Sequence, residues 1–326
     1  MEKSGTARKQ GRRRPELLAA LDLGTNNCRL LIAARARDGS LRVVDSFSRI
    51  VRLGEGVTRT GVLSEAAIER TVAALKICAG RLAKNRVKKL RAVATEACRR
   101  AANAELLVRR VADETGIALD IVSAEEEARL AAIGCAPLIG EDYAGALAFD
   151  IGGGSTEAIW IERNGGAPKP LHFASVPQGV MSWEDEADDR AAYDAMRAAM
   201  TSRFKEVRRQ MDAHGPFDAA RHHLLGTSGT VTTLAGVAMG LPRYLRSRVD
   251  GSWHDCAAIL AVGERLVAMG REARARLGCI GEERADLIVA GCAIFAAILI
   301  VWPCARLRVA DRGLREGILR ELMARR

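Results

Sequence analysis

The sequence has few aromatic side chains, which make up only 4% of its 326 residues. A stacking platform for single-stranded nucleic acid needs several aromatic rings along a basic groove. We therefore expect no nucleic-acid partner of that kind. Nearly half of the residues, 48%, are apolar, which is typical of a globular chain with a large buried core.

The sequence also lacks a disulfide or zinc framework. The cysteines stand singly, with no C-x-x-C and no nearby histidine pair, at positions 28, 78, 98, 135, 256, 279, 292 and 304. This pattern predicts reduced, mostly buried thiols. The His222–His223 pair leads into an apolar segment, as expected where a strand begins. Asp22 interrupts the first apolar run too early for a secretion signal, so we expect a cytoplasmic protein.

The positive charge is unevenly distributed. The net charge is +10, and the segment "MEKSGTARKQGRRRPE" carries six basic and two acidic residues, which is +4 of the total. Residues 1–15 are expected to be a disordered, solubilising basic tail. The remaining +6 attracts polyanions in general, but the chain shows no basic helix or aromatic face typical of a nucleic-acid binder.

One apolar run, residues 287–305, reaches the length of a minimal transmembrane helix. Asp286 and Arg306 bound it closely, and Pro303 lies near its end. The run is better explained by a buried helix that leads into a short strand. We expect no membrane span.

The chain is long enough for two domains, and strand-like and helix-like segments alternate along it. The segments "LLAALDLGTNNCRLLIA" and "GALAFDIGGGSTEAIWIE" share one pattern: an apolar strand, an aspartate, a glycine-containing turn and a returning strand. This repetition predicts an α/β chain with two related domains, residues 16–136 and 137–326, whose last helix packs back on the first domain. A cleft between them is the expected site.

The turns have the composition of phosphate-binding loops. Glycines 152–154 can adopt φ values closed to other residues and bring backbone amides close to an anion. Ser155 and Thr156 add hydroxyl donors, and a strand-end aspartate suits a hydrated Mg²⁺. A strand rather than a helix follows this loop, and no P-loop motif is present. A third turn, "LLGTSGTVTTLAG" (224–236), does lead into a helix-like segment, whose N-terminus favours anions.

A series of motifs identifies a family. The order "LDLGTNNCRLLIA", "RLGEG", "ATEACRRAAN", "SAEEEARLAAIG", "FDIGGGSTE", "LGTSGTVTTLAG", "ERADLIVAG" and "ADRGLREGIL" resembles the Ppx/GppA phosphatases, from about residue 17 to the C-terminus. The resemblance implies the actin-like, ribonuclease-H-like fold with a phosphate-binding cleft between two domains, in its short two-domain form. It also implies Mg²⁺, with Mn²⁺ as the alternative, and a homodimer.

The resemblance also implies roles for individual residues. Ser123 and Glu126 fit a capping box that opens a helix, whereas the glutamate before Ala-Arg, Glu127, matches the family's catalytic residue. Asp150, Glu157 and Asp22 match positions near the metal. The expected phosphate-binding residues are Gly24, Thr25, Asn26, Asn27, Arg29, Gly152, Gly153, Gly154, Ser155, Thr156, Gly226, Thr227, Ser228 and Gly229.

Two residues depart from the family pattern, and neither replaces a catalytic residue. Ala124 and Ser228 stand where the family commonly has glycine. Beyond the loops, several arginines are candidates for a path along a polyanion, since a linear polyphosphate needs repeated cationic contacts. They are Arg99, Arg100, Arg284, Arg312 and Arg315.

Three functions remain open at this stage. The first is an exopolyphosphatase that releases orthophosphate from the ends of inorganic polyphosphate. The second is a phosphohydrolase that removes the 5′ terminal phosphate of guanosine pentaphosphate. The third is an ATP-binding kinase or a non-catalytic nucleotide sensor of the same fold, for which residues 285–293 would form part of an adenosine pocket. The short form of the chain favours polyphosphate, and Glu127 argues against a purely regulatory protein.

Overall fold

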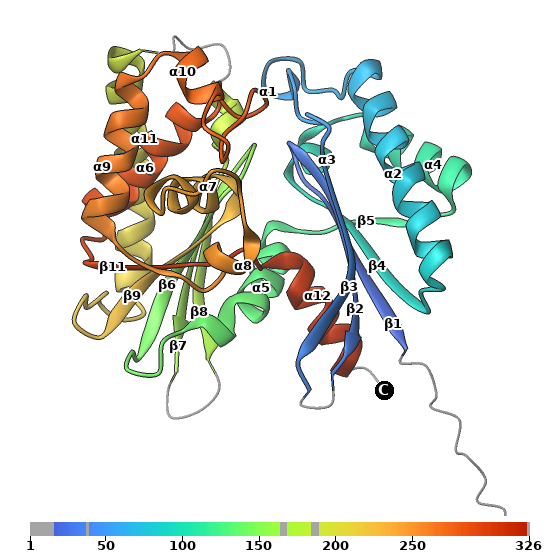
Figure 1. The fold of residues 1–326 in the computed structure, drawn as a ribbon, viewed down its shortest axis with the longest axis horizontal. Coiled ribbons are helices and arrows are strands. Elements are labelled where there is room, and N and C mark those ends of the chain that lie inside the picture. Colours follow the sequence, from blue (N-terminus) through green and yellow to red (C-terminus); the bar gives the residue numbers. More distant parts are fainter. Residues whose placement is uncertain (1–15, 37–38, 164–167, 184–188, 325–326) are drawn as a thin grey trace, which may run out of the picture.

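The computed structural model describes residues 16–36, 39–163, 168–183 and 189–324, so the predicted tail, residues 1–15, lies outside the described part. Two sheets stand side by side with helices around them (Figure 1). The first sheet has the strand order β3-β2-β1-β4-β5. Its strands are β1 (Leu17–Leu23), β2 (Asn27–Arg35), β3 (Leu41–Ile50), β4 (Lys89–Ala94) and β5 (Leu119–Ile121).

The second sheet repeats this order and adds one edge strand, giving β10-β11-β9-β6-β7-β8. Its strands are β6 (Gly145–Ile151), β7 (Thr156–Glu162), β8 (Lys169–Val176), β9 (His222–Thr227), β10 (Trp253–Asp255) and β11 (Arg306–Val309). In each sheet an antiparallel three-stranded meander is extended by two parallel strands. The shared topology confirms the predicted duplicated, actin-like α/β fold.

The two opening hairpins have the same register. Asp22 of β1 pairs with Arg29 of β2, and Asp150 of β6 pairs with Glu157 of β7. The matching positions therefore carry an Asp–Arg pair in the first half and an Asp–Glu pair in the second.

Amphipathic helices cover the sheets. Ser64 caps α2 by accepting a hydrogen bond from the Ala67 amide. The helices of the first half are α1 (Val57–Thr60), α2 (Glu65–Asn85), α3 (Glu96–Arg100), α4 (Ala104–Thr115) and α5 (Ala124–Cys135), followed by the 3₁₀ turn η1 (Ala136–Leu138). Those of the second half are the 3₁₀ turn η2 (Val180–Trp183), α6 (Arg190–Asp212), α7 (Ser228–Ala238), α8 (Arg246–Val249), α9 (Cys256–Ala268), α10 (Arg271–Ala275), α11 (Ile288–Val301) and α12 (Leu314–Ala324).

The long apolar run of the sequence forms α11, which is buried along nearly its whole length in the core of the second half. It leads into strand β11, as predicted. Among the described residues, no helix combines the length and the hydrophobicity needed to cross a bilayer. The cysteines are also as expected: all are free, and all but the partly exposed Cys304 are buried.

Two helices cross between the halves (Figure 1). Helix α5 packs against the second sheet through Ala128, Ala131 and Ala132, whereas α12 packs against the first sheet through Ile318 and Leu319. The last helix therefore lies on the first sheet. The boundary at residue 136 stays a prediction, but α5, which precedes it, packs with the half that follows.

The crossing of α5 and α12 depends on two glycines. A Cβ atom on Gly317 would lie 1.9 Å from the Leu130 carbonyl oxygen, and one on Gly134 would lie 2.0 Å from the Gly313 carbonyl oxygen. Both neighbours are backbone atoms that cannot rotate away. The two helix backbones are therefore in direct contact, which fixes how the two sheets are joined.

This contact predicts the stability of two alanine variants. Gly317→Ala should lower the free energy of unfolding by about 2 kcal/mol, because the added methyl forces the helices apart. Gly80→Ala is the matched control: Gly80 is an exposed position inside α2, and a Cβ added there would meet no atom within 4 Å. It should raise the free energy of unfolding by about 0.5 kcal/mol. Urea unfolding measures both, and equal effects would refute the backbone contact.

Candidate active site

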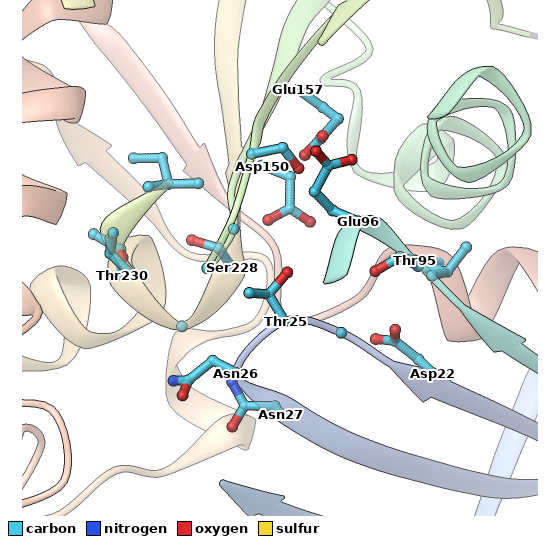
Figure 2. Close-up of a pocket in the computed structure, with 18 of the residues that line it drawn as sticks. Asp22, Thr25, Asn26, Asn27, Thr95, Glu96, Asp150, Glu157, Ser228 and Thr230 are labelled. Atoms are coloured by element: carbon cyan, nitrogen blue, oxygen red, sulfur yellow. The ribbon is translucent and has the colours of Figure 1, made fainter. Parts of the chain in front are cut away.

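The predicted site residues meet in one cleft between the two sheets (Figure 2). Its lining comes from the two opening hairpins, from α5 and from the start of α7. The predicted residues that line it are Asp22, Gly24, Thr25, Asn26, Asn27, Arg29, Glu127, Asp150, Gly152, Gly153, Ser155, Glu157, Ser228, Gly229 and Arg284. The described structure thus gathers most of the candidates into a single space.

The other candidates lie around this cleft. Gly154 and Arg100 line a second, smaller pocket beside it. Thr156, Gly226 and Thr227 belong to the buried strands β7 and β9. The cleft also contains Thr95, Glu96, Thr230 and Thr233, which the sequence reasoning missed, together with Leu287 and Ile288 from the segment 285–293. For Glu96 a signal existed, since it follows the apolar strand "AVAT". The segment "KLRAVATEA", residues 89–97, has the pattern of one strand, whereas β4 ends at Ala94 and α3 begins at Glu96.

The first two loops are closed in the same way. The Gly24 amide donates to the Asn27 carbonyl and the Gly152 amide to the Ser155 carbonyl, each at 2.9 Å. None of glycines 152–154 uses a left-handed φ, so the conformational reason predicted for them is wrong. Neighbouring atoms leave no room for a side chain at these positions. A Cβ on Gly152, for example, would lie 2.8 Å from the Ser155 carbonyl oxygen.

Four carboxylates are crowded into the cleft, and burial raises the pKa of each. The pKa of Asp150 is raised to about 6, mainly by burial, with Arg29 opposing the shift. That of Glu157 is raised to about 7 by burial and by the nearby Asp150. The pKa of Asp22 is likewise raised by burial, against the attraction of Arg29. The cleft therefore holds negative charge at a cost that a bound cation would relieve.

Glu127 is the fourth carboxylate, and α5 directs it into the cleft. Ser123 caps the helix by accepting a hydrogen bond from the Glu126 amide at 3.1 Å. The Glu126 carboxylate does not complete the predicted capping box; it binds Arg91 at 2.9 Å and Arg129 at 2.7 Å. Glu125 is exposed. Of the three consecutive glutamates, Glu127 is the one that lines the cleft.

Arg99 holds Glu127 in place. Its Nη1 donates to the Glu127 carboxylate at 2.7 Å and to the Val122 carbonyl at 2.9 Å, while Nη2 binds Glu96 at 2.8 Å. Burial, followed by the charge of Glu157, raises the pKa of Glu127 well above its usual range, and Arg99 opposes this shift. Arg99 is thus placed to hold the Glu127 carboxylate, and its predicted contact with a polyanion stays a prediction.

The remaining arginines differ in availability. Arg312 is bound to Asp250 and does not line the cleft itself, and its place on the polyanion path stays a prediction. Arg284 lines the cleft and donates to Thr233 Oγ1 at 3.1 Å. Burial and the neighbouring Arg29 lower the pKa of Arg284. Arg315 of α12 is half-buried, and its pKa is lowered by burial, with Arg29 and Asp22 both close enough to influence it. Arg29 and Arg284 therefore line the cleft, whereas Arg315 does not line it.

The third loop presents a helix N-terminus to the cleft. Ser228, Gly229 and Thr230 open α7 and line the cleft, where backbone amides at a helix start favour an anion. Ser228 has φ 98°, a left-handed value that favours glycine. The serine thus occupies a strained position, which fits the expectation that glycine is common there.

The side-chain chemistry suits a hard divalent cation, since the buried donors are carboxylates. Among the described residues, however, no three His, Cys, Asp or Glu side chains converge closely enough to enclose a metal ion. Mg²⁺ often binds one or two carboxylates and completes its octahedron with water and substrate phosphate oxygens. The residues present fit that open mode of binding and do not fit a closed protein cage.

The strain at Ser228 predicts an order of stability. Ser228→Gly removes the strain, whereas Ser228→Ala keeps it and also loses the hydroxyl that the Val231 amide contacts. We expect the glycine variant to be more stable than the alanine variant by about 1 kcal/mol. Chemical denaturation compares the two directly, and an alanine variant as stable as the glycine variant would contradict this interpretation.

The raised carboxylate pKa values predict how stability depends on pH without metal. The folded-state pKa of Glu157, about 7, lies above its ordinary value of 4.5, so between them the folded protein binds more protons than the unfolded chain. This group's contribution to stability is thus present at low pH and lost as pH rises through about 7. In chelator-treated buffer, the Tm of Glu157→Gln relative to the unsubstituted protein should rise from about pH 5 to about pH 8. A difference in Tm that stays constant would refute the raised pKa.

Comparison with known proteins identifies relatives along most of the chain. The chain is 33% identical over 282 residues to exopolyphosphatase 2 of Mycobacterium tuberculosis, covering 84% of this chain and 87% of that protein. It is 27% identical over 311 residues to a putative exopolyphosphatase of Haemophilus influenzae, covering 94% and 91%.

Solved structures show the same two-domain arrangement. The crystal structure of the Aquifex aeolicus Ppx/GppA family member has a TM-score of 0.78 and 29% identity, and it covers 95% of this chain and 98% of that chain. An exopolyphosphatase from Cytophaga hutchinsonii has a TM-score of 0.82 and 25% identity over the same shares. The family model of the Ppx/GppA phosphatases matches residues 32–326. The chain belongs to the Ppx/GppA phosphatase family.

Proposed function

We propose that this protein is an exopolyphosphatase, which hydrolyses the terminal phosphoanhydride of inorganic polyphosphate and releases orthophosphate. One observation carries the proposal: Glu127, held by Arg99, lines the same cleft as three loops with the composition of phosphate cradles. The names of the relatives from Mycobacterium tuberculosis and Cytophaga hutchinsonii support polyphosphate as the substrate.

In the proposed reaction, the terminal phosphoryl group lies between the first two loops, near Thr25 and Gly153. Glu127 orients a water molecule toward the phosphorus and accepts its proton, for which a raised pKa is favourable near neutral pH. Arg99 keeps the Glu127 carboxylate in one position throughout. Little more is required, because phosphoryl transfer depends mainly on positioning and on stabilised charge.

The site must also bind the negative charge of the phosphates that follow the terminal one. Arg29 and Arg284 line the cleft at α7 and are suited to the next phosphates of the chain. The α7 N-terminus adds backbone donors there. Product charge left on the shortened chain would thus face cations, whereas the attacking water faces a carboxylate.

We further propose Mg²⁺ as the cofactor, with Mn²⁺ as the alternative, held by Asp150 and Glu157 with Asp22 nearby. When bound, the ion would neutralise phosphate oxygens and stabilise the charge that develops during transfer. The free cysteines fit a reducing compartment, so a cytoplasmic location is part of the proposal. A homodimer remains an expectation from the family.

The proposal predicts the effect of removing the base. With Mg²⁺ present, Glu127→Gln should lower the rate of orthophosphate release from long-chain polyphosphate by at least about a hundredfold, since the amide cannot accept the proton. Glu125→Gln is the matched control, because Glu125 is exposed on the same helix turn and should leave the rate unchanged.

Guanosine pentaphosphate and ATP serve as parallel substrates in this assay. Faster release from pentaphosphate would replace the proposed substrate but keep the base. Turnover of ATP alone, or a Glu127→Gln variant as active as the unsubstituted protein, would overturn both.

A further inference from the structure

Thr25 lies where the loops of the two halves touch. The residue is only 8% exposed. A Cβ on Gly54 would lie 2.2 Å from Thr25 Cγ2, one on Gly153 would lie 3.0 Å from Thr25 Cβ, and one on Gly154 would lie 2.9 Å from Thr25 Oγ1. These three glycines form a notch, the Thr25 notch, that the threonine side chain fills.

Both sides of the notch are held by backbone hydrogen bonds. In the first half, the Gly54 amide donates to the Thr25 carbonyl at 2.9 Å. In the second half, the Met181 amide donates to the Gly153 carbonyl at 2.8 Å. Each loop is therefore fixed within its own half, and the two fixed loops meet at the Thr25 side chain.

The Thr25 notch separates two spaces. The main cleft is lined by Thr25, Glu96 and Gly153 on this side, and the smaller pocket beyond is lined by Thr25, Glu96 and Gly154. Glu96 adds to the division, since a Cβ on Gly154 would lie 3.3 Å from Glu96 Cγ. The cleft therefore ends at Thr25 and Glu96.

The closed end is the end that holds the predicted base. Glu96 and Glu127 share the Arg99 guanidinium, which places Glu127 close to the division. The cationic residues lie at α7 instead: a Cβ on Gly229 would lie 3.8 Å from Arg29 Nη2, and Arg284 donates to Thr233 Oγ1 at 3.1 Å. A phosphate beside Glu127 thus has the rest of its chain toward the arginines and the notch behind it.

This arrangement matters because internal and terminal phosphates differ in shape. An internal phosphate has a bridging oxygen on each side, so its chain must leave the site in two directions. A terminal phosphate continues in one direction only. We propose that Thr25, seated in its glycine notch, is an end stop that restricts the site to chain termini. The inference rests on the proposed function and adds the residue that makes the cleavage exolytic.

The test uses polyphosphate whose two ends are blocked as phosphoramidates, compared with the same chains unblocked. In the presence of Mg²⁺, calorimetric titration should show binding of blocked chains to the Glu127→Gln protein at least about tenfold weaker than binding of unblocked chains. Thr25→Gly should reduce this difference to less than about threefold, because it empties the notch and joins the two spaces.

Thr25→Val is the matched control, since it keeps the bulk of the side chain and removes only the hydroxyl. If Thr25 acts as a stop, the valine variant keeps the discrimination that the glycine variant loses. If Thr25 acts only as a hydrogen-bond donor to phosphate, valine and glycine lose unblocked-chain binding alike and neither changes the ratio, which would overturn the inference. Thermal unfolding checks that each variant is folded.

The outcomes also separate this inference from the proposed function. Equal binding of blocked and unblocked chains to the Glu127→Gln protein would overturn the end stop and leave polyphosphate as the ligand. Failure of unblocked chains to bind at all would overturn the proposed substrate and the end stop together. Because the first comparison needs no substitution at Thr25, the inference stays testable even if Thr25→Gly does not fold.

Discussion

The repulsion among buried carboxylates is the constraint on which the rest of this structure depends. Asp22, Asp150, Glu157 and Glu127 come from both halves of the chain and enter one cleft. Burial raises the pKa of each carboxylate. The charge of Glu157 raises the pKa of Glu127 further, and that of Asp150 raises the pKa of Glu157. Such a group of charges is stable only with cations beside it, and the protein supplies arginines at two places. A divalent ion and a polyanion bound together would complete the balance.

The duplicated hairpin explains how this asymmetry arises. The same register places Arg29 opposite Asp22 in the first half and Glu157 opposite Asp150 in the second. One copy therefore presents a cation and the other a second carboxylate. Helices α5 and α12, which cross between the sheets with their backbones in contact, keep the two copies at a fixed separation. The same hairpin, used twice, thus places an arginine at this position in the first half and a glutamate in the second.

The sequence predicted those parts that depend on local pattern. Strand periodicity and the glycine turns located both hairpins, and the Ser123 cap located the helix that carries Glu127. The sequence could not predict long-range pairing. Arg99 lies 28 residues from Glu127, and nothing in its neighbourhood distinguishes a positioning arginine from a substrate-binding one. The reason for Gly153 and Gly154 was likewise hidden, because Thr25 is distant in sequence and close only after the halves assemble.

The central claim is that water attacks the terminal phosphorus of a polyphosphate chain in this cleft. The most direct measurement is hydrolysis in ¹⁸O-labelled water with Mg²⁺, followed by mass analysis of the released orthophosphate and of the remaining chain. Our account predicts one ¹⁸O atom in each released orthophosphate and none in the shortened chain, because Glu127 directs water to the terminal group. Label found in the chain instead, or orthophosphate without label, would contradict it.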